Sequence, residues 1–139
     1  MKETICTIFG VLGAGIAHLF GGWTAAMTTL IIFMGLDYLT GLIVAGVFKK
    51  SSKSETGALE SKAGWIGLIR KFVSLLFVLV AYRLDLIIGT TYIKDAVCIA
   101  FIVNELISLT ENAGLMGIPI PEPIMNAIEL LKNGKKDNK

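Results

Sequence analysis

The sequence predicts an all-α integral membrane protein with four transmembrane helices and a short C-terminal amphipathic segment. The 139 residues are 54% hydrophobic and their mean hydropathy is +0.71, so polar residues are too few to cover a soluble globule. Asp37 is the one formally charged residue between Thr4 and Phe48. Most of the Lys and Arg residues fall where they would share one side of a membrane.

The apolar run from Thr4 to Phe48 predicts two helices folded back on each other. A transmembrane helix needs about 20 apolar residues to cross roughly 30 Å of hydrocarbon. One helix of 45 residues would be far too long, since each residue adds about 1.5 Å. We expect the break at Gly21–Thr24, because paired glycines weaken a helix and Trp23 favours the membrane interface. The predicted spans are about 5–21 and 25–48.

Two further spans are predicted at about 65–88 and 96–115, after a polar loop at 49–64. The third span is interrupted by charge. Arg70 and Lys71 are expected to extend toward lipid headgroups at one end, and Arg83 at the other. Asp85 is expected to neutralise Arg83 in part, and Lys94 and Asp95 are expected to mark the next membrane interface.

The tail at 119–139 completes what we expect to be a single membrane domain covering 1–139. Pro119, Pro121 and Pro123 are expected to stop regular structure. Beyond them, residues 125–132 are predicted to form a short helix whose apolar side chains lie on the membrane surface.

The distribution of Lys and Arg predicts the orientation. Six of them lie in or beside the long loop, and four lie in the tail: Lys49, Lys50, Lys53, Lys62, Arg70 and Lys71, and Lys132, Lys135, Lys136 and Lys139. Cytoplasmic loops of membrane proteins carry an excess of positive charge. Both termini and the long loop are therefore expected in the cytoplasm.

Small residues recur every four positions in the first apolar segment, at Gly13, Ala17, Gly21 and Ala25. Such rows let helix backbones approach closely in lipid. The row predicts contact with another span of the same chain or with another subunit, and the sequence leaves both open. His18 stands beside the row, where a hydrogen-bonded interface residue is favoured over a proton carrier.

Asp37 is the costliest residue in the predicted membrane segments. A carboxylate near the bilayer centre costs roughly 2.5–3.5 kcal/mol on insertion scales. Asp37 shares a helix face with Gly41 and Ala45, at steps of four residues. One interpretation is a packing residue buried between helices. The favoured one is a carboxylate facing a polar cavity, an oligomer interface or a proton path.

The fourth span carries a polar stripe. At about 100° per residue, Asn104 and Glu111 fall within about 20° of each other. Ser108, Asn112 and Glu105 lie within about 100° of Asn104. This face is unsuited to lipid, so it is expected to contact another helix, another subunit or water. Together with the small row and the Asp37 face, it supplies our candidate residues for oligomerisation or a pore.

No catalytic, metal-binding, cofactor or nucleotide motif is recognisable in the sequence, which predicts a protein that is not an enzyme. The two cysteines, Cys6 and Cys98, lie in or beside apolar segments and are interpreted as packing residues. The loop lysines are interpreted as determinants of topology and partners of lipid headgroups, not as contacts to nucleic acid.

Two stretches of the chain resemble the toxin secretion/phage lysis holin family. The first is Asp37-Tyr38-Leu39-Thr40-Gly41 with Lys49-Lys50-Ser51-Ser52 and the segment from Gly64 to Lys71. The second, more specific stretch runs from Asn104 to Gly114 and on through Gly117-Ile118-Pro119-Ile120-Pro121. The resemblance covers the chain from the second span to the tail.

This resemblance implies a phage or prophage protein that forms homo-oligomers in the host cytoplasmic membrane. Such a protein opens lesions through which an endolysin, or in clostridial relatives a toxin, leaves the cell without any required direct contact. A small four-helix transporter or proton-coupled channel using Asp37 or Glu105 is the alternative. An inert subunit of a larger membrane complex is a third reading.

Overall fold

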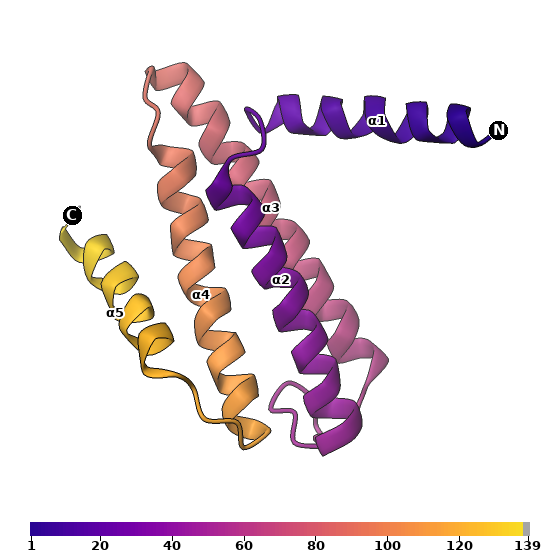
Figure 1. The fold of residues 1–139 in the computed structure, drawn as a ribbon, viewed down its shortest axis with the longest axis vertical. Coiled ribbons are helices and arrows are strands. Elements are labelled where there is room, and N and C mark those ends of the chain that lie inside the picture. Colours follow the sequence, from indigo (N-terminus) through magenta and orange to yellow (C-terminus); the bar gives the residue numbers. More distant parts are fainter. Residues whose placement is uncertain (138–139) are drawn as a thin grey trace.

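The computed structural model describes residues 1–137, which form five α-helices and contain no strand (Figure 1). The helices are α1 (Lys2–Leu19), α2 (Ala25–Ile43), α3 (Ser61–Ile88), α4 (Ile93–Leu115) and α5 (Glu122–Asp137), and a π-helical turn, η1 (Val44–Phe48), continues α2. The all-α prediction is confirmed. Lys139 lies outside the described residues, as do the side chains of Lys135 and Lys136.

Helices α2, α3 and α4 lie side by side and form a bundle (Figure 1). Helix α4 contacts both α2 and α3, so it is the central element, and α5 packs along its outer side. Helix α1 instead projects away from the bundle, and none of its residues is buried.

The bundle core is built from apolar residues at helical spacing. Met27, Leu30 and Met34 of α2 meet Val78 of α3 and, from α4, Cys98 and Ile102. Steps of three and four residues keep each set on one side of its helix. Burying such a stripe is what holds amphipathic helices together. Cys98 is fully buried as a packing residue, whereas Cys6 on α1 is exposed.

A tight turn separates α1 from α2 at the expected glycine pair. Gly21 and Gly22 have positive φ angles of 79° and 93°, which residues other than glycine rarely adopt. Thr24 then begins α2 as its N-cap, because its hydroxyl accepts a hydrogen bond from the Met27 N–H at 3.2 Å. Since α1 ends at Leu19, Gly21 and Ala25 do not continue its row of small residues.

The long loop is shorter than predicted because α3 begins at Ser61. Inside it, the Ser51 N–H donates to the Gly57 carbonyl at 2.9 Å. Gly57 has a φ of 77°, and a Cβ there would lie 2.6 Å from the Lys49 carbonyl oxygen. The segment 49–60 is therefore a compact closed loop whose geometry depends on this glycine.

The connection between α3 and α4 differs from the expected Arg83–Asp85 neutralisation. The Asp85 carboxylate accepts hydrogen bonds from the Thr90 hydroxyl at 2.5 Å and from the N–H groups of Ile93 and Lys94 at 3.0 and 2.9 Å. The first N–H groups of a helix lack partners within it. Asp85 supplies those partners for α4, and an acid is also favoured there by the helix dipole.

The C-terminal helix is longer than the predicted 125–132 segment, and it begins before Pro123. Proline is tolerated in the first turn of a helix because the N–H it lacks would have no partner there. Ile128 is only 5% exposed and Leu131 packs against the bundle core. The apolar side of α5 is thus at least partly covered by α4 and the core, and is not simply laid on a membrane surface.

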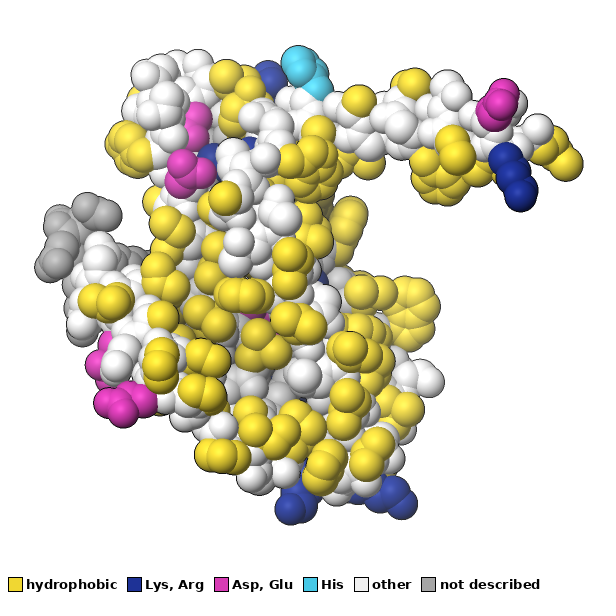
Figure 2. All heavy atoms as spheres, viewed as in Figure 1, with side chains coloured by type: hydrophobic (Ala, Val, Ile, Leu, Met, Phe, Trp, Pro, Cys, Tyr) yellow, Lys and Arg dark blue, Asp and Glu magenta, His cyan; other side chains and the backbone are white. Residues whose placement is uncertain are grey.

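The outside of the bundle is strongly apolar, and basic side chains are visible at both of its ends, including the end where α2 is connected to α3 (Figure 2). Among the described helices, one is long and apolar enough to cross a membrane by length and composition: the continuous helix Ala25–Phe48, with a mean hydropathy of 2.0. This helix is the one clear span candidate among residues 1–137, and the four spans are a prediction.

Candidate functional site: a buried ionic cluster

Three ionisable side chains from three helices meet inside the bundle. The Lys71 ammonium of α3 lies 2.7 Å from Asp37 Oδ2 of α2 and 2.7 Å from Glu105 Oε2 of α4. Asp37 is 3% exposed and Glu105 is 7% exposed. One ammonium group therefore binds two buried carboxylates and connects all three helices.

The second oxygen of Asp37 is held by the polar stripe of α4. Ser108 Oγ donates to Asp37 Oδ1 at 2.6 Å, and Asn112 Nδ2 donates to the same oxygen at 3.0 Å. The Asn112 amide also reaches the Asp37 carbonyl at 3.3 Å and Thr40 Oγ1 at 2.9 Å. Every polar atom of this carboxylate is thus engaged. A buried charge is tolerated when it is paired and fully hydrogen-bonded.

These positions continue the apolar core stripes of their helices. Asp37 follows Met34 by three residues, and Lys71 precedes Val78 by seven, so each lies on the core side of its helix. The cluster is consequently an extension of the core in which polar contacts replace apolar ones. Two carboxylates share one ammonium group, so the cluster has more acidic than basic groups.

Lys71 is the site residue that the sequence analysis missed. Its side chain is only 14% exposed and points inward, so the expected extension toward headgroups is wrong. Lys71 points inward because two carboxylates buried away from water are costly without a positive charge beside them. Its spacing from Val78 was the signal that could have identified it.

The other candidates in α2 and α4 line a cavity of about 640 Å³ beside the cluster. Gly41 and Ala45 form part of its wall, and the exposed Asn104 and Glu111 lie at its α4 side. The predicted polar stripe is therefore divided. Glu105, Ser108 and Asn112 bond to other helices, while Asn104 and Glu111 are exposed.

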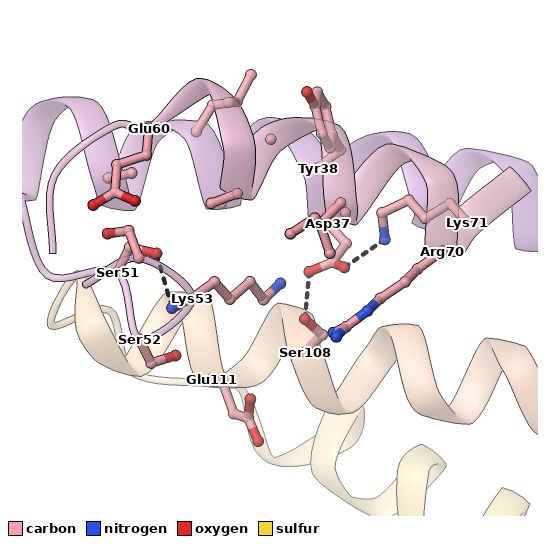
Figure 3. Close-up of a pocket in the computed structure, with 18 of the residues that line it drawn as sticks. Asp37, Tyr38, Ser51, Ser52, Lys53, Glu60, Arg70, Lys71, Ser108 and Glu111 are labelled. Carbon is pink, nitrogen blue, oxygen red and sulfur yellow. Dashed lines mark hydrogen bonds and ion pairs between the residues drawn. The ribbon is translucent and has the colours of Figure 1, made fainter. Parts of the chain in front are cut away.

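The close-up of this cavity shows residues from the loop, α2, α3 and α4 around one polar space (Figure 3). Asp37, Lys71 and Ser108 lie together at one end, and Lys53 extends from the loop toward them. Among residues 1–137, no group of three His, Cys, Asp or Glu side chains is placed to hold a metal ion.

The candidates in the first helix lie apart from this site. A Cβ added at Gly13 would meet no atom within 4 Å, and Ala17 belongs to the same projecting helix. Gly21 lies in the turn, where a Cβ would overlap the Tyr82 ring of α3. Contact of the small row with another span of the same chain is therefore not seen in the described residues, apart from this turn.

A second buried lysine joins that turn to the bundle. Lys94, expected at the membrane interface, is 5% exposed. Its ammonium group donates to the carbonyl oxygens of Phe20 and Gly22 and lies 5.5 Å from the centre of the Tyr82 ring. Positive charge is favoured at a helix C-terminus, where carbonyl groups lack partners. Lys94 thus fixes the end of α1 against the α3–α4 turn.

Comparison with known proteins identifies the relatives of this chain. The model of the bacteriophage holin family matches residues 14–133. The chain belongs to the bacteriophage holin family. The resemblance to holins inferred from the two motif stretches is confirmed, and the matched segment contains the whole ionic cluster and the Lys94 contact.

Individual holin relatives cover nearly the full length of the chain. An uncharacterized protein of Halalkalibacterium halodurans is 38% identical over 128 residues, which cover 88% of this chain and 89% of the relative. An uncharacterized protein of Listeria monocytogenes is 36% identical, covering 94% and 91%. A probable holin of Bacillus phage phi105 is 31% identical over 118 residues, covering 84% and 81%. No solved structure matches the chain.

Holin family membership supports a phage holin role at the cytoplasmic membrane. It also suggests a membrane protein without enzymatic activity. The groups of the cluster bond three helices of one chain to one another.

Proposed function

We propose that this holin accumulates in the bacterial cytoplasmic membrane, forms homo-oligomers there and opens lesions that release an endolysin. In this proposal four helices span the membrane, with both termini and the loop 49–60 in the cytoplasm. Its partners are lipids and further copies of the chain. The endolysin or exported toxin passes through the lesion without needing to bind it.

The observation that carries the proposal is a concentrated polar cluster inside a bundle whose outside is apolar. Asp37, Lys71 and Glu105 are satisfied by one another in the monomer. If α4 separates from α2 and α3 during assembly, those groups lose their partners and require water or a second subunit. A polar face hidden in the monomer and exposed in the oligomer is what the wall of a water-filled lesion needs.

A channel or transporter is the second candidate, because the cavity reaches Asp37 and Glu105. In that case the two acids bind an ion or substrate while the bundle stays closed. The two functions differ in the size of what crosses the membrane.

Inducible expression in bacteria that contain a large cytoplasmic reporter enzyme tests the proposal. A holin is expected to stop growth abruptly and release the reporter, or to pass a co-expressed wall hydrolase. A vector carrying the gene with an early stop codon is the control. Leakage of ions with full retention of the reporter would contradict lesion formation and favour the channel.

A further inference from the structure

The cavity beside the ionic cluster contains basic side chains that the cluster does not use. Lys53 comes from the loop and Arg70 from α3, and both line the cavity. Figure 3 shows the two side chains extending into the same space. The ion pairs among the described residues both involve Lys71, so neither Lys53 nor Arg70 has a described carboxylate within ion-pair distance.

The acidic residues around the cavity are largely accounted for. Asp37 and Glu105 bind Lys71. Glu60 accepts hydrogen bonds from the Thr56 N–H and hydroxyl at 3.3 and 3.0 Å, and the Glu111 carboxylate points away from Lys53 (Figure 3). The hydroxyl groups of Ser51 and Ser52 are additional hydrogen-bond donors in the cavity wall. Four acidic and three basic side chains line the cavity, so its capacity to bind an anion depends on Lys53 and Arg70, which have no described acidic partner.

The loop holds Lys53 in this place. The hydrogen bond from the Ser51 N–H to the Gly57 carbonyl, at 2.9 Å, closes the loop around Lys53. The Lys53 N–H also donates to Ser51 Oγ at 3.2 Å. A closed loop loses less conformational entropy on binding a ligand than an open one.

An apolar groove continues directly from the basic cavity. It has a volume of about 350 Å³ and is lined by Tyr38, Leu42, Leu59, Trp65 and Leu68, together with Glu60, Ser61 and Gly64. Tyr38, Leu42 and Leu59 also line the basic cavity. A ligand that fills both spaces must carry an anionic group at one end and a hydrocarbon chain at the other.

We infer that this composite site binds an anionic phospholipid of the membrane leaflet that faces the loop. Its phosphate group would be bound by Arg70, Lys53 and the serine hydroxyls, since guanidinium and phosphate groups match in geometry. One acyl chain would lie in the groove between Leu42 and Trp65. Basic pockets between helices on the cytoplasmic side are suited to anionic headgroups.

The test measures lipid binding to the full chain purified in a neutral detergent, by native mass spectrometry with added phosphatidylglycerol or phosphatidylcholine. The test variant is Lys53→Gln/Arg70→Gln. Lys49→Gln/Lys50→Gln is the matched control, because it removes the same charge from residues that do not line the cavity. We expect the test variant to bind phosphatidylglycerol about 10-fold to 30-fold more weakly, and the control to bind like the parent. Neither result depends on lysis, so the inference can fail while the proposed function stands.

A second readout uses the groove itself. In a Trp23→Phe background, Trp65 is the remaining tryptophan, so its quenching by brominated phosphatidylglycerol reports an acyl chain in the groove. Stronger quenching than with brominated phosphatidylcholine, abolished by Lys53→Gln/Arg70→Gln, supports the site. Equal weakening in both double variants would overturn it, because general surface charge would then explain binding. Displacement of the lipid by millimolar glycerol phosphate alone would overturn the part assigned to the groove.

Discussion

Lys71 of α3 and Asp37 of α2 are 34 residues apart in the sequence, yet their side chains meet at 2.7 Å inside the bundle. The same ammonium group binds Glu105, another 34 residues along the chain. Each of the three bundle helices therefore contributes one charged group to a common point. The arrangement fixes the rotation of every helix about its axis, because turning any one of them removes a partner from the other two.

Removing the cation is expected to be the most damaging change in the cluster. Lys71→Met leaves two carboxylates close together without a positive charge. Breaking a buried ion pair from one side costs about 3–5 kcal/mol. We expect a lower unfolding midpoint in detergent and faster degradation in cells. The triple variant Lys71→Met/Asp37→Asn/Glu105→Gln carries no charge and should recover much of the loss. A stable Lys71→Met protein would contradict a structural role for the pair.

Weakening the cluster without destroying it is expected to change the timing of lysis. Asp37→Asn keeps the shape of the side chain but removes its charge, so the contact with Lys71 becomes weaker. If opening of this cluster precedes assembly, the variant should lyse cells earlier at equal expression. Glu129→Gln, at an exposed position of α5, is a control that removes one acidic charge outside the cluster. Unchanged timing in Asp37→Asn would make Asp37 a packing residue only.

The sequence predicted the helical class and the helix break at Gly21–Thr24 because both depend on local composition. It also singled out Asp37, Glu105, Ser108 and Asn112, since polar groups in apolar segments need partners. It did not predict Lys71, the common partner of Asp37 and Glu105. Lys71 lies beside Arg70 near one end of an apolar run, where local reasoning favours extension toward headgroups, and the distance to Asp37 depends on how three helices pack.

Local sequence also could not predict the partners of Asp85 and Lys94. Both were assigned from their neighbours in sequence, Asp85 to Arg83 and Lys94 to the membrane interface. Their actual partners are backbone groups at helix ends, on α4 for Asp85 and at the end of α1 for Lys94. Such contacts require knowing where each helix ends in space.

The turn after α1 offers a test of the contact with Tyr82. Gly21 and Gly22 both have positive φ, so either alanine substitution should cost about 1–2 kcal/mol in backbone strain. Gly21→Ala should cost more, because its Cβ would overlap the Tyr82 ring, whereas a Cβ at Gly22 meets no atom within 4 Å. Unfolding in detergent measures both. Combining Gly21→Ala with Tyr82→Ala should be less harmful than the sum of the single changes, and strict additivity would contradict the contact.

The four-span topology predicts which positions are accessible from outside the cell. In a Cys6→Ala/Cys98→Ala background, an impermeant maleimide should label Thr91→Cys in the α3–α4 turn but leave Ser54→Cys unlabelled. Lys2→Cys decides whether α1 crosses the membrane. Lys2→Cys should be protected if α1 spans the membrane. It should be labelled if α1 lies along the outer surface, an arrangement that is compatible with the projection of α1 from the bundle. Labelling of Ser54→Cys in intact cells would contradict the orientation.

The row of small residues on α1 can now be tested with a substitution that the monomer should tolerate. None of the residues of α1 is buried, and a Cβ at either Gly13 or Gly15 would meet no atom within 4 Å. Gly13→Leu therefore has room within one chain. If Gly13 and Ala17 form a contact between subunits, added bulk should force two backbones apart and reduce crosslinked oligomers while the monomer persists.

Gly15→Leu is the matched control, because it makes the same substitution about 200° away around the helix. We expect Gly13→Leu to delay or abolish lysis and Gly15→Leu to leave oligomer yield and lysis near the parental values. An equal loss of oligomers and lysis in both variants would indicate that α1 tolerates no added bulk on either side, as in a closely packed helix bundle. Parental oligomers and lysis in Gly13→Leu and Ala17→Leu would reject the row as an assembly surface. Assembly would then depend on the polar face of α4, which must leave Asp37 and Lys71 before it can meet a second subunit.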